Sequence, residues 1–84
     1  MEEKEYETLL DMFASEGWKL FIEGAKELED AVVQNCVDIA DTNEKWQYLR
    51  GEVHQLRRIL GYEDYIRALW AQQEEDAAQD AMEA

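Results

Sequence analysis

The sequence predicts an all-α protein, and three observations support that prediction. Proline is absent and glycine occurs only four times in 84 residues, so little interrupts a helix. Good helix formers such as Glu, Ala, Leu and Gln dominate the composition. Large apolar residues recur at steps of three and four, which places them on one helix face. We expect an antiparallel helical hairpin over about residues 16–40 and 43–60. A short N-terminal helix and a short aromatic C-terminal helix with an acidic tail should flank it.

The clearest helical pattern lies in residues 43–60. Its large apolar residues are Trp46, Leu49, Val53, Leu56 and Leu60. This spacing predicts a seam that packs against another helix. Gly61 follows, and glycine best tolerates the left-handed conformation common at a helix C-terminus. The helix is therefore expected to end there.

The two preceding helices carry similar stripes. Residues 3–14 begin with several glutamates, which complement the positive end of a helix dipole. Ser15 then breaks the pattern and is a candidate cap for the second helix. The stripe of that helix, over about residues 16–40, consists of Trp18, Phe21, Ile22, Ala25, Leu28, Val32, Cys36 and Ile39. Both Trp18 and Trp46 are expected in the seam of the hairpin.

A short polar link connects the two long helices. Asp41, followed three residues later by Glu44, resembles a capping box. Because the link is short, the helices should be antiparallel neighbours. The predicted register places Trp46 near Cys36, Val53 near Leu28, and Leu60 near Phe21 or Ile22.

The C-terminal segment is first aromatic and then acidic. Its apolar residues are Tyr62, Tyr65, Ile66, Leu69 and Trp70. Exposing so many would leave an unusual apolar patch, so this segment either folds back onto the hairpin or forms an interface. Residues 73–84 have good helix propensity but no apolar face, and are expected to be helical or disordered. We therefore predict one helical domain over residues 1–72 with a tail over 73–84.

Charge is distributed unevenly along the chain. The net charge is −13, yet residues 43–60 carry a net charge of +2 and form the one basic segment. The acidic excess disfavours binding to nucleic acid or to an anionic membrane surface. The candidate protein-interface residues are Tyr65, Leu69, Trp70, Arg50, Arg57 and Arg58. Alternatively, the arginines pair with acidic residues of this chain or of another copy, where exposed pairs add little stability.

No pattern indicates catalysis or a cofactor. His54 and Cys36 are the only residues of their kinds and lie on different predicted helices, whereas a metal site needs several ligands at set spacing. Cys36 lies on an apolar stripe and is expected to be a buried structural thiol. A general acid would need a carboxyl group in a pocket, for which a thin core leaves little room. We expect no enzymatic activity, no cofactor and no metal.

Two glycines interrupt the predicted long helices. Gly24 and Gly51 each cost about 0.5–1 kcal/mol relative to alanine. A close helix crossing or contact with another subunit would explain them, and an exposed position that tolerates glycine is the alternative. For Gly51, between Leu49 and Val53, we favour a close approach.

Two passages resemble small helical proteins encoded by tailed bacteriophages. The first is Leu10-Asp-Met-Phe13 followed by Glu16-Gly-Trp-Lys-Leu-Phe21. The second is Trp46-Gln-Tyr-Leu-Arg-Gly51 followed by Leu56-Arg-Arg-Ile-Leu60. The resemblance covers residues 9–60 and implies a role in the virion or in contact with the host. It assigns no functional residues.

The sequence thus favours a non-enzymatic, oligomeric protein-interaction or assembly module, phage-encoded, that binds a protein partner or itself. The alternative is an acidic mimic of nucleic acid that inhibits a host nucleic-acid-binding protein. No apolar run is long enough to span a membrane, and the first residues lack the pattern of a signal peptide. We expect the protein to be cytoplasmic, located in the cytoplasm of a host cell or in the virion if it is phage-encoded.

Overall fold

A computed structural model describes residues 1–38 and 41–83 and contains four helices. They are α1 (Glu3–Phe13), α2 (Glu16–Asp38), α3 (Asn43–Leu60) and α4 (Tyr62–Glu83). The described residues include no strand, so the predicted all-α class is confirmed. The predicted end of the second helix, at residue 40, and the last residue of the tail lie outside the described residues.

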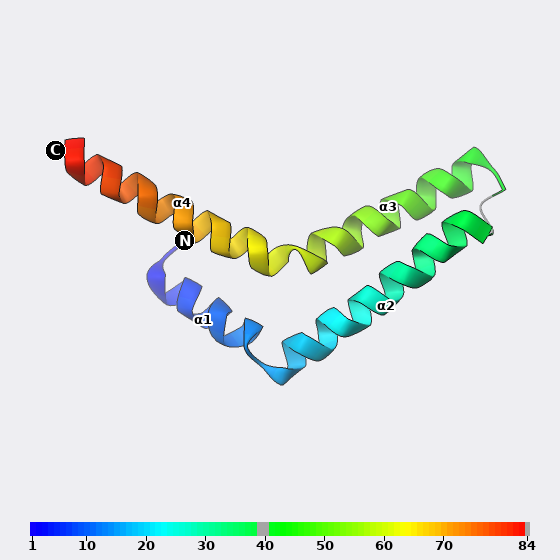
Figure 1. Cartoon of the computed structure of the whole chain (residues 1–84), viewed down its shortest axis with the longest axis horizontal. Helices are drawn as coiled ribbons and strands as arrows, with labels where there is room; N and C mark the ends of the chain where they lie inside the picture. The colour runs from blue at the N-terminus through cyan, green and yellow to red at the C-terminus, as the bar shows by residue number, and fades with distance from the viewer. Residues whose placement is uncertain (39–40, 84) are drawn as a thin grey trace.

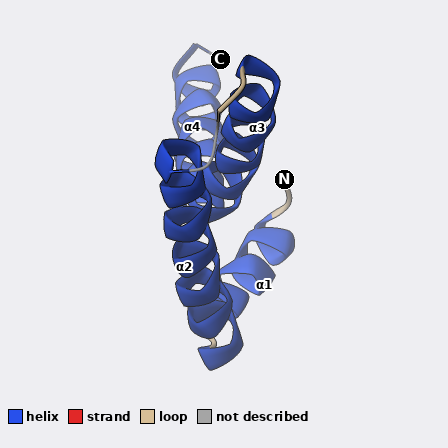
Figure 2. Ribbon diagram, turned by 90° about the vertical axis from the view of Figure 1, so that its right-hand side faces the viewer, coloured by secondary structure: helices blue, strands red, loops and turns tan. Residues whose placement is uncertain are grey.

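The four helices form a bent, thin layer with two arms (Figure 1). In one arm α2 and α3 pack side by side and antiparallel, which confirms the predicted hairpin. In the other arm α4 lies beside α1 and extends beyond it. The Cα atoms span 60 × 31 × 13 Å, so the molecule is about one helix thick. The view from the side shows the same narrow stack (Figure 2).

A layer this thin encloses only a small core. The buried side chains are Phe13, Ala25, Val32, Val53 and Ile66. Three of them belong to the predicted stripes of α2 and α3 and fill the seam of the hairpin. At the end near the bend, Leu60 and Ile22 line one depression, which agrees with the predicted register there. No large side chain is completely buried among the described residues.

Aromatic side chains hold the bend between the two arms. The ring centroid of Phe13, at the end of α1, lies 5.1 Å from that of Trp18 and 6.0 Å from that of Tyr62. Trp18 lies in the first turn of α2 and Tyr62 begins α4, and their ring centroids are 6.4 Å apart. We call these three residues the aromatic corner. Their edge-to-face and tilted geometries are favourable for aromatic rings.

A second aromatic contact joins α1 to α4. The rings of Tyr6 and Trp70 stack with centroids 4.8 Å apart and planes 14° from parallel. The C-terminal segment therefore packs on α1 and does not fold back onto the hairpin. The aromatic and acidic parts form one continuous helix of 22 residues, longer than the short helix expected. Of the two alternatives for the tail, the helical one holds through Glu83.

The links between helices confirm one predicted cap and correct another. The Ser15 hydroxyl accepts a hydrogen bond from the Trp18 N–H at 3.1 Å and donates to the Met12 carbonyl at 2.6 Å. It thus caps α2 as predicted. The N-cap of α3, however, is Thr42 and not Asp41, because Thr42 is the extended residue whose hydroxyl reaches the Lys45 N–H at 3.2 Å.

The glycines behave differently from the predictions. Gly61 ends α3 as expected, but its φ of −92° is right-handed, because α4 restarts at once and the Tyr65 N–H donates to the Gly61 carbonyl. A Cβ added to Gly24 or Gly51 would meet no atom of another helix within 4 Å. The close approach favoured for Gly51 is therefore wrong within this chain. Trp46, expected in the seam, is 43% exposed.

Replacement of Phe13 tests the aromatic corner. We expect Phe13→Ala to lower the free energy of unfolding by about 3–5 kcal/mol, because a buried aromatic side chain leaves a cavity. Urea denaturation followed by circular dichroism measures this change. The neighbouring Met12 is 38% exposed, and Met12→Ala is the matched control with a much smaller loss. Equal losses would contradict the role of the corner.

Replacement of Gly51 tests whether its surroundings are open. Because nothing contacts the added methyl group, Gly51→Ala should raise the free energy of unfolding by about 0.5–1 kcal/mol through helix propensity. The same denaturation experiment measures it. A destabilised variant would contradict the open surroundings.

Candidate interaction surface

Helix α2 carries two apolar stripes, and α3 covers only one of them. Ala25 and Val32 face the hairpin seam and are buried. The second stripe is offset by one residue, with steps of four and three, and contains no charged residue. Its members are Gly17, Phe21, Gly24, Leu28, Ala31 and Asn35, and Leu20 lies beside it.

The second stripe is open to solvent. Leu20 is 66% exposed, and Phe21 and Leu28 are each 53% exposed. The expectation that Phe21 and Leu28 lie in the hairpin seam is therefore wrong. The physical reason is geometric, because one neighbouring helix covers only part of a helix circumference. Among residues 1–38 and 41–83, no helix packs over this side of α2.

Three connected depressions follow this surface from the hairpin to the bend. Leu20, Phe21 and Leu28 line the first, together with Leu56 and Ile59 of α3. Phe21 and Ile59 also line the second, which continues to Tyr62, and Tyr62 borders the third with Tyr65. We call the exposed side chains along this path the apolar face, and its members are Leu20, Phe21, Leu28, Ile59, Tyr62 and Tyr65.

The structure divides the predicted interface residues of α4. Tyr65 is 61% exposed and belongs to the apolar face, whereas Leu69 is 37% exposed. Trp70 is half-buried because its ring stacks on Tyr6. This contact within the chain occupies one side of the indole.

The three candidate arginines have different surroundings. The guanidinium carbon of Arg50 lies 5.4 Å from the ring centroid of Trp46, within the range of a cation–π contact. Arg57 pairs with Glu29 of α2 at 3.4 Å, as the ion-pair interpretation predicts. Arg58 lines the second and third depressions and so borders the apolar face.

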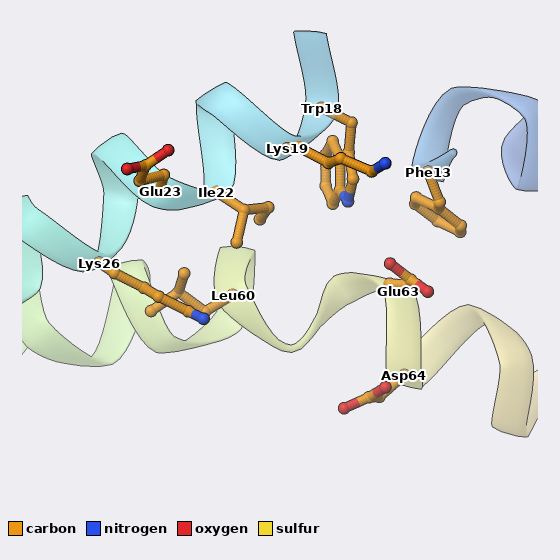
Figure 3. Close-up of a pocket in the computed structure, with 9 residues that line it drawn as sticks. All are labelled: Phe13, Trp18, Lys19, Ile22, Glu23, Lys26, Leu60, Glu63 and Asp64. Carbon is orange, nitrogen blue, oxygen red and sulfur yellow. The ribbon is translucent and has the colours of Figure 1, made fainter. Parts of the chain in front are cut away.

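The opposite side of the bend is charged. An open depression of about 520 Å³ there is lined partly by lysines and carboxylates (Figure 3). Lys19 and Lys26 come from α2, and Glu63 comes from α4, where it accepts a hydrogen bond from Arg67 at 3.0 Å. Near the bend the two sides of α2 thus differ in chemistry, with Lys19 and Lys26 on this side and Leu20 and Phe21 on the other.

The described residues form few clusters of metal-binding or nucleophilic side chains. Within residues 1–38 and 41–83, no group of three His, Cys, Asp or Glu side chains is arranged to hold a metal ion. His54 is exposed, and Cys36 is half-buried rather than buried as expected.

The comparisons with known proteins identify no relative. No family model, curated protein or solved structure matches this chain. Nothing in them links it to phage proteins. Of the helices described, none combines the length and the apolar character that crossing a membrane requires.

The single broad stripe predicted for α2 does not separate the exposed stripe from the seam, although the sequence contains a signal that does. Gly17, Gly24 and Ala31 recur every seven residues, as do Phe21 and Leu28, and no charge falls among them. A helix that carries two adjacent seams of this kind requires two covering elements.

One ion pair in the link perturbs a pKa. The Asp41 carboxylate lies 3.0 Å from the Lys45 ammonium, and this hydrogen bond and charge hold the pKa of Asp41 below its ordinary value. A lowered pKa in the folded state stabilises the fold only while Asp41 is ionised. That contribution is lost as the pH falls through the folded-state pKa.

We expect Lys45→Gln to return the pKa of Asp41 towards its ordinary value, because the variant removes the positive charge. An NMR titration of the Asp41 carboxyl carbon measures the midpoint in both proteins. Lys26→Gln, in α2 away from this link, is the matched control and should leave the midpoint unchanged. An Asp41 midpoint that does not respond to Lys45→Gln would contradict the pairing.

Proposed function

We propose that this protein is a non-enzymatic interaction module that binds another protein through its apolar face. The observation that carries the proposal is the exposure of Phe21 and Leu28 on a helix stripe free of charge, with the exposed Leu20 beside it. In a chain with 35% charged residues, an uncharged stripe of this length marks a surface meant to be covered.

The energetics support this function. Covering one exposed leucine or phenylalanine completely is worth about 1.5–3 kcal/mol, so these three side chains are a substantial driving force for association. Phe21 lies between the first two depressions, where a partner side chain can fill the space on either side. Tyr62 and Tyr65 extend the face with aromatic groups, which are frequent anchors of interfaces.

The charged border suits a specific interface. Arg58 lies at the edge of the apolar face, where a charge orients a partner without being desolvated. We include in the proposal the role in the virion or in contact with the host that the resemblance to phage proteins implies. Its support is that sequence resemblance over residues 9–60.

Site-specific photo-crosslinking tests the proposed function. A benzophenone analogue of phenylalanine replaces Phe21 in one variant and Val37 in another, and each is expressed in cells and irradiated. Val37 is 76% exposed, lies nine residues from Leu28 and so falls on the opposite side of α2. We expect protein adducts from position 21 and few from position 37.

Equal adduct yields at the two positions, or none at either, would contradict a binding role for the apolar face. The mass of an adduct also shows whether the partner is another protein or the same chain.

One observation favours the alternative of an acidic mimic of nucleic acid. That function requires carboxylates in ordered rows, and α4 is helical through Glu83. Asp76, Asp80 and Glu83 follow one another at steps of four and three, so they lie along one side of the helix. They project from the part of α4 beyond its contact with α1.

Truncation after Gln72 distinguishes the two functions. Acidic mimicry predicts that the full chain displaces double-stranded DNA from a basic DNA-binding protein and that the truncated chain does not. An interaction module that uses the apolar face predicts position-21 adducts from both forms. Loss of the adducts on truncation would contradict the apolar face as the binding surface.

A further inference from the structure

The single layer leaves more surface exposed than a compact monomer of this size. The chain exposes 6618 Å². A compact protein of 9.9 kDa exposes about 5,200 Å² by the usual scaling of area with mass. The radius of gyration of the present chain is 18.2 Å, whereas about 12 Å is typical of a compact domain of this length. Because domains are normally built from two packed layers, a second layer is missing.

We propose that a second copy of this chain supplies that layer. The two hairpins pack with their apolar faces together, and α2 of one copy lies over α3 of the other. This inference rests on the proposed function and names the partner. The excess of about 1,400 Å² per chain exceeds the roughly 800 Å² per partner of a standard interface. The apolar face supplies the apolar part of this excess area, and the end of α4 that extends beyond α1 accounts for some of the remaining area.

The shape of the exposed stripe suits another helix. Small residues at Gly17, Gly24 and Ala31 alternate with larger ones at Phe21, Leu28 and Asn35, at steps of three and four. Such steps form the seam of packed helices, where side chains of one helix fill spaces on the other. A Cβ added to Gly24 would meet no atom of another helix within 4 Å, so the surface there has room for a side chain from the second copy.

Charge decides which helices meet. Helix α2 carries six acidic residues against two lysines, whereas α3 carries four basic residues against two glutamates. With the two-fold axis parallel to the hairpins, each acidic α2 covers a basic α3. An axis across the hairpins would instead place the two acidic α2 helices on each other. Opposite charges therefore favour the parallel axis.

This arrangement brings two charged borders together. Glu27 lies seven residues after Leu20, on the outer flank of α2, and Arg58 borders the apolar face on α3. A rotation about an axis parallel to the hairpins keeps each residue at its height along the helices. It therefore brings the outer flank of α2 beside the outer flank of α3 in the second copy, with Glu27 near Arg58.

Sedimentation equilibrium of the purified full chain in the micromolar range tests the dimer. We expect the unmodified chain to form dimers and Leu28→Glu to weaken dimerisation at least about tenfold, because a charge enters the interface in both copies. Leu28 is 53% exposed in the single chain, so the variant should keep its helicity by circular dichroism. Val37→Glu introduces the same charge on the opposite side of α2 and should leave the dimer intact.

A monomeric unmodified chain, or equal weakening by Leu28→Glu and Val37→Glu, would overturn the proposal. If the chain is monomeric while photo-crosslinking at position 21 traps a different protein, the dimer fails and the proposed function stands. If position 21 traps nothing in cells, both fail.

A charge exchange tests the arrangement of the two copies. Glu27→Lys and Arg58→Glu should each weaken the dimer several-fold, and the double variant should recover most of the loss. Tighter association of Glu27→Lys would overturn the placement of α2 over α3, because it would show two acidic α2 helices in contact.

Discussion

The packing of Phe13, Trp18 and Tyr62 at the bend is the interaction on which the rest of the structure depends. These rings join the end of α1 to the starts of α2 and α4 within 5.1–6.4 Å. Without it, the hairpin and the α1/α4 arm would be connected only by the chain and by small contacts. With it, the two arms share one core, and Ser15 fixes the turn between α1 and α2 through hydrogen bonds on both sides.

The same corner sets the angle that keeps the molecule one layer thick. Because the α1/α4 arm points away from the hairpin, neither of its helices can lie across α2 and α3 (Figure 1). The hairpin buries one stripe of α2, and the neighbouring stripe keeps Phe21 and Leu28 in solvent. An uncovered apolar face is thus a direct consequence of the bend, and both proposals follow from it.

The charge of the protein helps to explain how a single chain can expose this apolar face. A net charge of −13 gives repulsion that opposes indiscriminate association, while the exposed stripe itself carries none. The basic residues are concentrated in α3. Arg57 and Arg50 are engaged by Glu29 and Trp46, which leaves Arg58 at the border of the apolar face. The positive charge of Arg58 attracts a partner that brings carboxylates to this border, although the molecule as a whole is acidic.

The sequence by itself determined the helices and the hairpin, because helix periodicity and capping are local properties that neighbouring residues specify. The cap residue Ser15 followed from its type at a break in the pattern, and the spacing predicted a broad stripe on α2 that includes Ala25 and Val32. Tertiary structure decided which stripe of α2 is covered, since that depends on where α3 lies and on the absence of a second layer. It also decided that Trp70 packs on Tyr6 and that Gly61 stays right-handed, because each depends on the direction in which α4 leaves the bend.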